Sequence, residues 1–282
     1  MSRQPNRESA IDLDRVLSVA VSAARRAGAI LREQFRKPQK IRYKGEVDLV
    51  TEADLRSERA ITSRLRRAFP RHLIVGEELG EQNARAAGAR FRWYVDPLDG
   101  TTNFAHGFPV FAVSLALMDG DRPAVGVVYN PLLREMFTAI RGRGARLNGR
   151  PIRVSSVPRL AESLLGTGFP TRKRVANPNI RYYWEYTLRS HGVRRAGAAA
   201  LDLCSVACGR FEGFWEFGLK PWDTAAGMLL VEEAGGRVTD FNEQPYYPGG
   251  PEIVASNGHI HAEFCRIGRK IAQSTPALPI PR

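Results

Sequence analysis

The 282-residue sequence predicts an α+β protein in which layers of helices and sheets are stacked in one compact unit. Three observations lead to this prediction. Two long segments near the N-terminus carry apolar residues at helical spacing. Short alternating segments separated by turns follow them, and the second half alternates helical with extended segments. The 43% hydrophobic and 25% charged residues are typical of a globular protein with a large core.

The N-terminal part is predicted to contain two amphipathic helices. Residues 11–36 carry apolar side chains at helical spacing, and Pro38 ends that pattern. After a short extended segment, Thr51 and Asp54 fit a capping box for a second helix, which Pro70 closes.

The remaining elements are read from alternation, turn residues and helix signals. Expected strands of the first half are 73–75, 91–95, 112–118, 124–129 and 135–140, with a polar loop at 80–90. The last three form an antiparallel meander, so that the two helices cover one face of a sheet. Expected strands of the second half are 164–167, 193–196, 211–217, 237–241 and 253–255. Expected helices there are 177–190, 197–207, one from 221 to about 233, and 259–273.

We expect a single catalytic domain at residues 10–273. Its N-terminal lobe covers about 10–155 and its C-terminal lobe about 156–273, with flexible tails at 1–9 and 274–282.

The composition suggests a cytoplasmic protein without a membrane partner. No apolar run approaches the ~20 residues of a membrane span, and the first residues do not resemble a signal peptide. The three cysteines include no CxxC pair, which fits a reducing compartment. The net charge of +13 indicates a basic surface that attracts anionic substrates, and it leaves an RNA-binding or polyanion-binding patch open.

Residues 93–111 contain two acids at the end of a predicted strand. Pro97 and Gly100 are expected to break the strand, so Asp96 and Asp99 lie where a loop begins. Two such carboxylates can converge on one hard cation, and N–H groups at the following helix start can hold an anion. The alternative is structural: Asp96-Pro97 as a turn and Asp99 as a helix cap.

Further acids occupy similar positions. Glu77 follows the strand at 73–75, and Asp223 lies at the start of a helix. A solvated loop and an ordinary helix cap are the alternatives for these two residues. If the four carboxylates meet in one cleft they require a cation, and oxygen ligands favour Mg²⁺, Mn²⁺ or Ca²⁺ over Zn²⁺.

Other phosphatase chemistries fit the spacing poorly. Two residues separate Asp96 from Asp99, whereas haloacid-dehalogenase-like enzymes use Asp-x-Asp. Cys204 and Arg210 match Cys-x₅-Arg, but Cys204 lies in a predicted packed helix. The pair His259-x-His261 is expected to lie on the surface.

Three motifs together resemble the signatures of the inositol monophosphatase family. They are Gly-Glu-Glu at 76–78, Asp-Pro-Leu-Asp-Gly-Thr-Thr-Asn at 96–103 and Trp-Asp-Thr-Ala-Ala-Gly at 222–227, and residues 47–54 resemble the segment before them. Order and separation match from about residue 10 to 272. The resemblance implies the layered αβαβα sandwich of inositol monophosphatases and fructose-1,6-bisphosphatases.

The resemblance also implies hydrolysis of a phosphate monoester by metal-activated water, with two or three Mg²⁺ ions per subunit, or Mn²⁺. The implied ligands of the first metal are Glu77, Asp96 and the carbonyl of Leu98, and those of the second are Asp96, Asp99 and Asp223. The implied catalytic residues are Asp54, Thr101 and Glu77. The implied substrate contacts are Gly100 and Thr101 for phosphate, and Ala199 and Glu216 for substrate hydroxyls. Lys44 resembles a mobile-loop lysine, but its position is offset by one residue.

The implied substrate is myo-inositol 1-phosphate or a similar polyol or sugar phosphate. Histidinol phosphate, fructose 1,6-bisphosphate and 3′-phosphoadenosine nucleotides are alternatives. Lithium sensitivity and a homodimer follow from the resemblance alone. A hypothesis of another class is a regulator that binds RNA or the transcription machinery.

Overall fold

The computed structural model describes residues 11–37, 42–43, 49–82, 88–169 and 177–274. Its helices are α1 (Leu13–Phe35), α2 (Glu52–Ala68), α3 (Thr101–Ala105), the 3₁₀ helix η2 (Leu160–Glu162), α4 (Asn179–Thr187), α5 (Ala199–Ala207), α6 (Pro221–Glu233) and α7 (His261–Ser274). Its first strands are β1 (Arg42–Tyr43), β2 (Leu49–Val50), β3 (Leu73–Gly76), β4 (Gly80–Gln82), β5 (Phe91–Asp99), β6 (Ala112–Asp119), β7 (Arg122–Asn130) and β8 (Glu135–Ile140). The others are β9 (Ala145–Leu147), β10 (Arg150–Pro151), β11 (Leu164–Thr167), β12 (Gly192–Arg194), β13 (Gly213–Phe217), β14 (Arg237–Thr239) and β15 (Glu252–Ser256).

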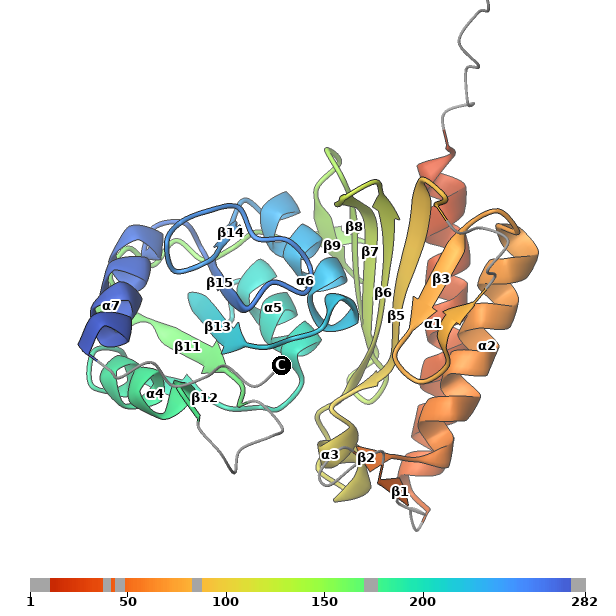
Figure 1. Ribbon diagram of the computed structural model, residues 1–282, viewed down its shortest axis with the longest axis horizontal. Coiled ribbons are helices and arrows are strands. Elements are labelled where there is room, and N and C mark those ends of the chain that lie inside the picture. The colour runs from red at the N-terminus through yellow and green to blue at the C-terminus, as the bar shows by residue number, and fades with distance from the viewer. Residues whose placement is uncertain (1–10, 38–41, 44–48, 83–87, 170–176, 275–282) are drawn as a thin grey trace, which may run out of the picture.

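Helices and sheets alternate across the molecule in five layers (Figure 1). From right to left in Figure 1, α1 and α2 cover an eight-stranded sheet, α5 and α6 fill the middle, a five-stranded sheet follows, and α4 and α7 form the outer layer. The predicted α+β class and its αβαβα layering are therefore confirmed.

The two N-terminal helices begin as the sequence indicates. The Asp12 side chain accepts hydrogen bonds from the first turn of α1. The capping box of α2 is confirmed, because the Thr51 N–H donates to Asp54 Oδ2 at 2.8 Å. Small residues such as Ala24 and Ala27 line the buried face of α1 and let it approach the sheet closely.

The large sheet has the order β10-β9-β8-β7-β6-β5-β3-β4. Its described pairs are antiparallel except for β3 with β5, which run in parallel with Gly76 opposite Val95. This parallel pair places the C-terminal ends of β3 and β5 at the same edge of the sheet.

The small sheet has the order β12-β11-β13-β15-β14, with parallel pairs at β11–β12 and β11–β13. Helix α6 joins the two sheets at very short range. A Cβ atom at Gly126 of β7 would lie 2.9 Å from the carbonyl oxygen of Ala226. Only glycine allows this approach, which brings the start of α6 close to the β3–β5 edge.

Three predicted segments were wrong in detail. Strand β5 continues through Pro97 to Asp99 instead of ending before it. The proline is tolerated because the β5–β6 ladder is irregular between Asp96 and Asp99, so no ladder hydrogen bond is lost there. The polar loop contains β4, and the meander extends into β9 and β10, whose few residues carry no clear alternation.

The expected surface position of His261 was also wrong. His259 is exposed, but His261 is buried at the start of α7 and lies 2.8 Å from both Ser256 Oγ and Thr239 Oγ1. Its helical phase explains this, since His261, Phe264 and Cys265 face the same core. The prediction that Cys204 is a core residue is confirmed.

The described helices include none with the length and apolar character needed to cross a lipid bilayer. Lys44, the predicted tail 1–9 and residues 275–282 of the predicted tail 274–282 lie outside the described residues, whereas Ser274 is the last residue of α7. The single-domain boundaries stay a prediction.

His261 gives a pH-dependent test of this packing. Burial lowers the pKa of His261 to about 4, so between pH 6.5 and about 4 the unfolded chain binds a proton that the folded chain does not. His261 therefore contributes stability above pH 6.5, and this contribution is lost as the pH falls. We expect His261→Gln to lower the free energy of unfolding by about 1–3 kcal/mol at pH 7.5 and by progressively less toward pH 4.5.

Urea denaturation at several pH values measures this difference. The matched control is His259→Gln, which should be close to the original chain at every pH. A cost of His261→Gln that does not change with pH would contradict the account.

Candidate active site

The first two candidate ligands meet at the β3–β5 edge. Glu77 follows β3 directly, and its N–H donates to the Val95 carbonyl at 3.1 Å. Asp96 is the next residue of β5, and its Oδ1 accepts from the Leu98 N–H at 2.9 Å. The parallel pairing therefore places the two acids side by side, although they belong to separate sequence motifs.

Asp99 connects this edge to the C-terminal half. Its Oδ2 accepts a hydrogen bond from the Ala200 N–H at 2.8 Å, at the start of α5. The N-cap residue of α5 is Ala198, whose side chain makes no cap hydrogen bond. Asp99 thus acts as a cap from another strand, and its negative charge lies at the positive end of the helix.

Asp223 reaches the same region from α6. Its Oδ2 accepts from the Lys220 N–H at 2.7 Å, which closes the first turn of the helix. The Ser114 hydroxyl of β6 donates to the Trp222 carbonyl at 3.1 Å. Because Ser114 pairs with Asp96 across the β5–β6 ladder, this bond holds the start of α6 against the acidic edge.

Asp54 and Thr101 form a hydrogen-bonded group beside the acids. Both the N–H and the hydroxyl of Thr51 donate to Asp54 Oδ2, at 2.8 and 2.5 Å. The Thr101 hydroxyl lies 3.1 Å from Asp54 Oδ1 and 3.0 Å from the Leu98 carbonyl. One hydroxyl proton can serve only one of these acceptors at a time.

Gly100 turns the chain from β5 into α3. Its φ of 93° lies in the left-handed region, and a Cβ atom there would lie 2.9 Å from the Val110 carbonyl oxygen. Glycine is required on both counts. The turn leaves the backbone of Gly100 and Thr101 at the beginning of α3.

The carboxyl groups repel one another. Burial raises the pKa of Asp96 well above its usual value, and the charges of Glu77, Asp99 and Asp223 raise it further. Burial and Asp223 raise the pKa of Asp99 to about 8, although N–H groups at the start of α5 oppose the shift. Burial also raises the pKa of Asp223 to about 6, against the lowering effect of its Lys220 and Asp96 hydrogen bonds.

These donors fit a divalent cation. All are carboxylates, the charges of the neighbouring acids raise the pKa of Asp96 and Asp99, and only Lys220 among the named causes adds a nearby positive charge. Within the described residues, however, no three acidic, histidine or cysteine side chains are already arranged as a metal-binding group. The residues are gathered but their oxygens are turned partly toward backbone N–H groups.

Comparison with known proteins decides the family. The profile of the inositol monophosphatase family matches residues 12–273. The chain belongs to the inositol monophosphatase family. The sequence-based resemblance is therefore confirmed, and the chain is an enzyme that hydrolyses phosphate monoesters.

Individual members of the family cover most of the chain. An inositol-1-monophosphatase from Synechocystis is 46% identical over 255 residues, or 90% of this chain and 88% of the relative. A Nus factor SuhB from Pseudomonas aeruginosa is 46% identical over 250 residues, or 86% of this chain and 91% of the relative. The solved inositol monophosphatase from Anabaena has 41% identity and a TM-score of 0.83, and it covers 92% of this chain and 97% of its own.

Glu216, which the family resemblance implies as a contact for substrate hydroxyls, lies in the C-terminal half of the chain. It is buried on β13, and its carboxylate covers Gly168, where a Cβ atom would come within 2.1 Å of Oε1. Burial raises the pKa of Glu216 well above its usual value, Asp223 and Asp99 add to this, and Arg195 opposes it. Because the charges of Asp223 and Asp99 act on Glu216, its carboxyl group lies near the acidic edge.

Sequence reasoning missed three supporting residues. Glu58 of α2 is buried and accepts hydrogen bonds from the Glu78 and Leu79 N–H groups at 2.8 and 3.0 Å, so it holds the loop of Glu77. Its spacing from the apolar Ile61 on the same helix face could have indicated its burial.

Asn103 and Asp202 are the other two. The Asn103 amide donates to the carbonyls of Val110 and Ala196, both at 2.8 Å, and thereby ties α3 to the segment before α5. Asp202 is buried on α5, and burial and the charge of Glu216 raise its pKa. An acid within an Ala- and Leu-rich helix was a visible signal for Asp202.

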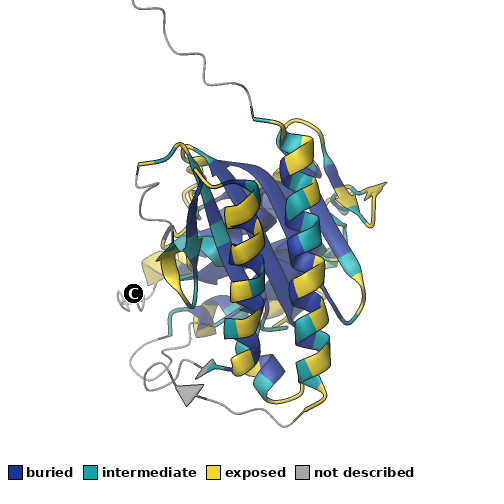
Figure 2. Cartoon of the chain, turned by 90° about the vertical axis from the view of Figure 1, so that its right-hand side faces the viewer, coloured by how far each residue is buried: buried dark blue, intermediate teal, exposed yellow. Residues whose placement is uncertain are grey.

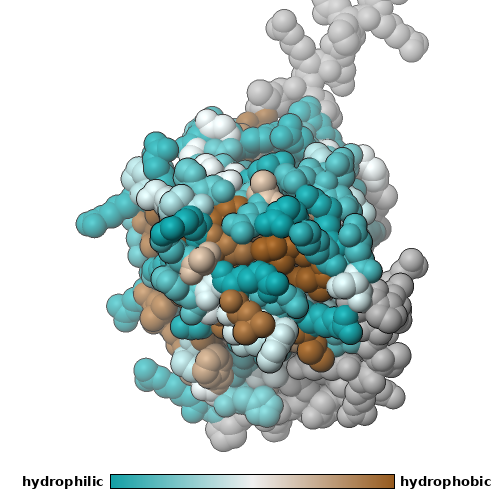
Figure 3. Space-filling view, turned by 90° about the vertical axis from the view of Figure 1, so that its left-hand side faces the viewer, coloured by the Kyte–Doolittle hydropathy of each residue, from teal (hydrophilic) through white to brown (hydrophobic). Residues whose placement is uncertain are grey.

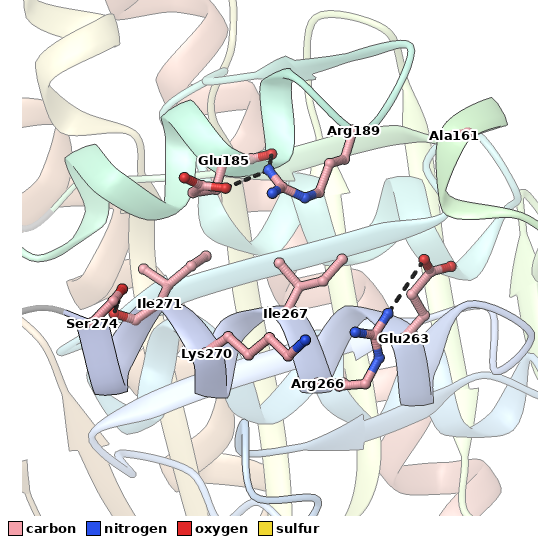
Figure 4. A pocket seen from close by; sticks show the side chains of 9 residues that line it. All are labelled: Ala161, Glu185, Arg189, Glu263, Arg266, Ile267, Lys270, Ile271 and Ser274. Atoms are coloured by element: carbon pink, nitrogen blue, oxygen red, sulfur yellow. Dashed lines mark hydrogen bonds and ion pairs between the residues drawn. The ribbon is translucent and has the colours of Figure 1, made fainter.

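A separate cavity of about 610 Å³ lies between α4, α7 and η2. It opens on the outer face shown in Figure 3, where hydrophobic side chains gather among hydrophilic ones. Four of its charged residues pair locally, Glu185 with Arg189 and Glu263 with Arg266 (Figure 4). No predicted site residue lines this cavity.

The repulsion among the carboxylates predicts a pH-dependent response to metal. Acids whose folded pKa is raised stabilise the fold at low pH and lose that contribution as the pH rises through about 6 for Asp223 and about 8 for Asp99. Because Mg²⁺ neutralises these charges, we expect it to raise the melting temperature of the chelator-treated protein more at pH 8 than at pH 6.

Thermal unfolding followed by circular dichroism measures this response. Asp96→Asn should reduce it strongly, since the amide can still accept from the Leu98 N–H but carries no charge. The control Asp121→Asn, at an exposed acid, should keep it. Equal Mg²⁺ responses in both variants would contradict the assignment.

Proposed function

We propose that this enzyme hydrolyses myo-inositol 1-phosphate in a Mg²⁺-dependent reaction. One observation carries the proposal: the acids that follow β3, end β5 and begin α6 gather at one sheet edge. Two of them, Asp99 and Asp223, raise the pKa of Glu216, a residue suited to binding substrate hydroxyls. Family members are generally metal-dependent, and the Synechocystis relative is named an inositol-1-monophosphatase.

Two or three Mg²⁺ ions, or Mn²⁺, would be held by the acids of this edge. The proposed ligands are Glu77, Asp96, the Leu98 carbonyl, Asp99 and Asp223. Bound divalent cations would neutralise phosphate charge and lower the pKa of water, which suits a reaction that is extremely slow without a catalyst.

Asp54 and Thr101 are proposed to orient the attacking water. When the Thr101 hydroxyl donates to Asp54 Oδ1, its lone pairs are left to accept a proton of the water. Thr51 holds the Asp54 carboxylate through Oδ2, so Oδ1 stays in place as an acceptor for the Thr101 hydroxyl. Glu77, which directly follows β3, is the third proposed catalytic residue, together with Asp54 and Thr101.

The phosphate group is proposed to bind at the start of α3, where the N–H groups of Gly100 and Thr101 suit an anion. Glu216 would accept hydrogen bonds from substrate hydroxyls. Ala199 can contribute only a contact surface or its carbonyl, because its N–H already bonds to Asp99.

We also propose a cytoplasmic homodimer that Li⁺ inhibits, as the family resemblance implies. A second role, in transcription or RNA binding, is favoured by the 46% identity to the relative named Nus factor SuhB. This role and the phosphatase activity can coexist.

Substrate choice is tested with a panel of phosphate esters. Phosphate release should require Mg²⁺, should be fastest from myo-inositol 1-phosphate, and should fall by at least a thousandfold in Asp96→Asn. The panel also contains histidinol phosphate, fructose 1,6-bisphosphate and a 3′-phosphoadenosine nucleotide. Faster turnover of any of these three would replace the proposed substrate.

Glu216 makes a separate prediction about selectivity. Loss of a charged hydrogen-bond acceptor for a hydroxyl costs about 1.5–3 kcal/mol, so Glu216→Gln should lower kcat/KM for myo-inositol 1-phosphate by about 10- to 100-fold. For p-nitrophenyl phosphate, which lacks these hydroxyls, the loss should be under threefold. Equal losses for both esters would show that Glu216 only supports the fold.

A further inference from the structure

We propose that the outer face of α1 and α2 binds the phosphate backbone of duplex nucleic acid. The exposed arginines of these helices and their ends define this arginine face. They are Arg15, Arg25, Arg26, Arg36, Arg56, Arg59, Arg64, Arg66, Arg67 and Arg71. Basic residues that are scattered in the sequence are thus gathered on the outer side of two helices. Figure 2 shows exposed residues along the outer side of both helices.

Acids do not balance this charge. The exposed acids of the same helices and their caps are Asp12, Asp14, Glu33 and Glu52. Asp14 already pairs with Arg143, and Glu33 with Lys37. No ion pair in the described residues joins any arginine of the arginine face to a carboxylate.

Several arginines elsewhere on the surface are paired. Arg90 and Arg141 both pair with Asp119, and Arg210 pairs with Glu135. Exposed arginines without a carboxylate partner in the described part of the chain also occur outside the two helices, for example Arg122 and Arg150. The arginine face is therefore distinguished by the number of its arginines and by their shared side, and not by the lack of ion pairs alone.

The arrangement of the arginines suits a regular row of phosphates. On α2, Arg59 follows Arg56 by three residues, and Arg66 and Arg67 follow Arg59 by seven and eight residues. The four therefore share one side of the helix and span about 17 Å. This length matches about five nucleotides at 3.4 Å per step. Arg26 of α1 lies near the same row, since both Arg26 and Arg56 lower the pKa of Glu33.

The character of the face favours duplex nucleic acid over other polyanions. Exposed large hydrophobic residues of the described chain are Leu79, Phe108, Leu133, Ile180, Trp184, Leu188 and Tyr247, and none lies on α1 or α2. The face therefore lacks the aromatic platforms that single strands use for stacking. It also lacks the apolar anchors with which amphipathic helices enter a membrane. Guanidinium groups that bond phosphates bidentately remain as its only binding chemistry.

The arginine face points away from the proposed catalytic edge. Arg56 follows Asp54 by only two residues, but Asp54 is buried whereas Arg56 is exposed. Arg66 follows Asp54 by twelve residues, about 18 Å along the helix. The proposal rests on charge and geometry alone, so it stands or fails independently of the phosphatase assignment.

Fluorescence anisotropy with labelled 24-base-pair RNA and DNA duplexes, from 50 to 200 mM KCl, tests the proposal. The protein should bind at least one duplex, with an affinity that falls steeply with salt. The variant Arg26→Gln/Arg59→Gln/Arg66→Gln/Arg67→Gln should bind at least tenfold more weakly at 100 mM KCl. Its log–log salt slope should be shallower by about 3–4, since each duplex phosphate contact contributes ~0.9.

The matched control removes four exposed arginines from another face, as Arg122→Gln/Arg146→Gln/Arg150→Gln/Arg153→Gln. It carries the same net charge and should bind within twofold of the original chain. Unchanged melting temperatures establish that both variants are folded. No salt-dependent binding at 50 mM KCl, or equal losses in the two variants, would overturn the proposal. Tighter binding to phosphatidylserine vesicles than to either duplex would also overturn it.

Discussion

The buried carboxylates of Asp96, Asp99 and Asp223 impose the central constraint on this structure. Each has one oxygen held by a backbone N–H, of Leu98, Ala200 and Lys220 respectively. Burial raises the pKa of all three acids, and the charges of neighbouring carboxylates raise the pKa of Asp96 and Asp99 further. A protein keeps such an arrangement at a cost in stability unless a cation offsets the repulsion, and members of this family are generally metal-dependent.

Hydrogen bonds at this edge also link the large sheet to the helices between the two sheets. Asp99 belongs to the large sheet and caps α5, which lies between the sheets, while Asn103 bonds to the chain just before α5. Ser114 links β6 to the start of α6. The edge that carries the proposed site is therefore also the junction of the two halves, so substitutions there should also affect the coupling of the layers.

The sequence predicted the layering well because apolar periodicity and caps are local signals, as at α1 and the Thr51–Asp54 capping box. The sequence prediction was wrong for His261, whose burial depends on the side of α7 that it occupies. It was also wrong for Pro97, which stays within β5 because the β5–β6 ladder is irregular there. The motif acids were found from their strand-end and helix-start positions. Glu58 and Asn103 were not, since their partners lie 20 and 93 residues away. The sequence showed the number of arginines, but only folding brings them to one face.

The cation requirement is tested most directly by counting bound metal. Chelator-treated protein is dialysed to equilibrium against Mn²⁺, and the retained metal is measured for the original chain and for Asp96→Asn/Asp223→Asn. The account predicts that the original chain retains at least one Mn²⁺ and that the double variant, still folded by circular dichroism, retains none at the same free concentration. Equal retention by the two proteins would contradict the claim that these carboxylates are gathered to bind a metal ion.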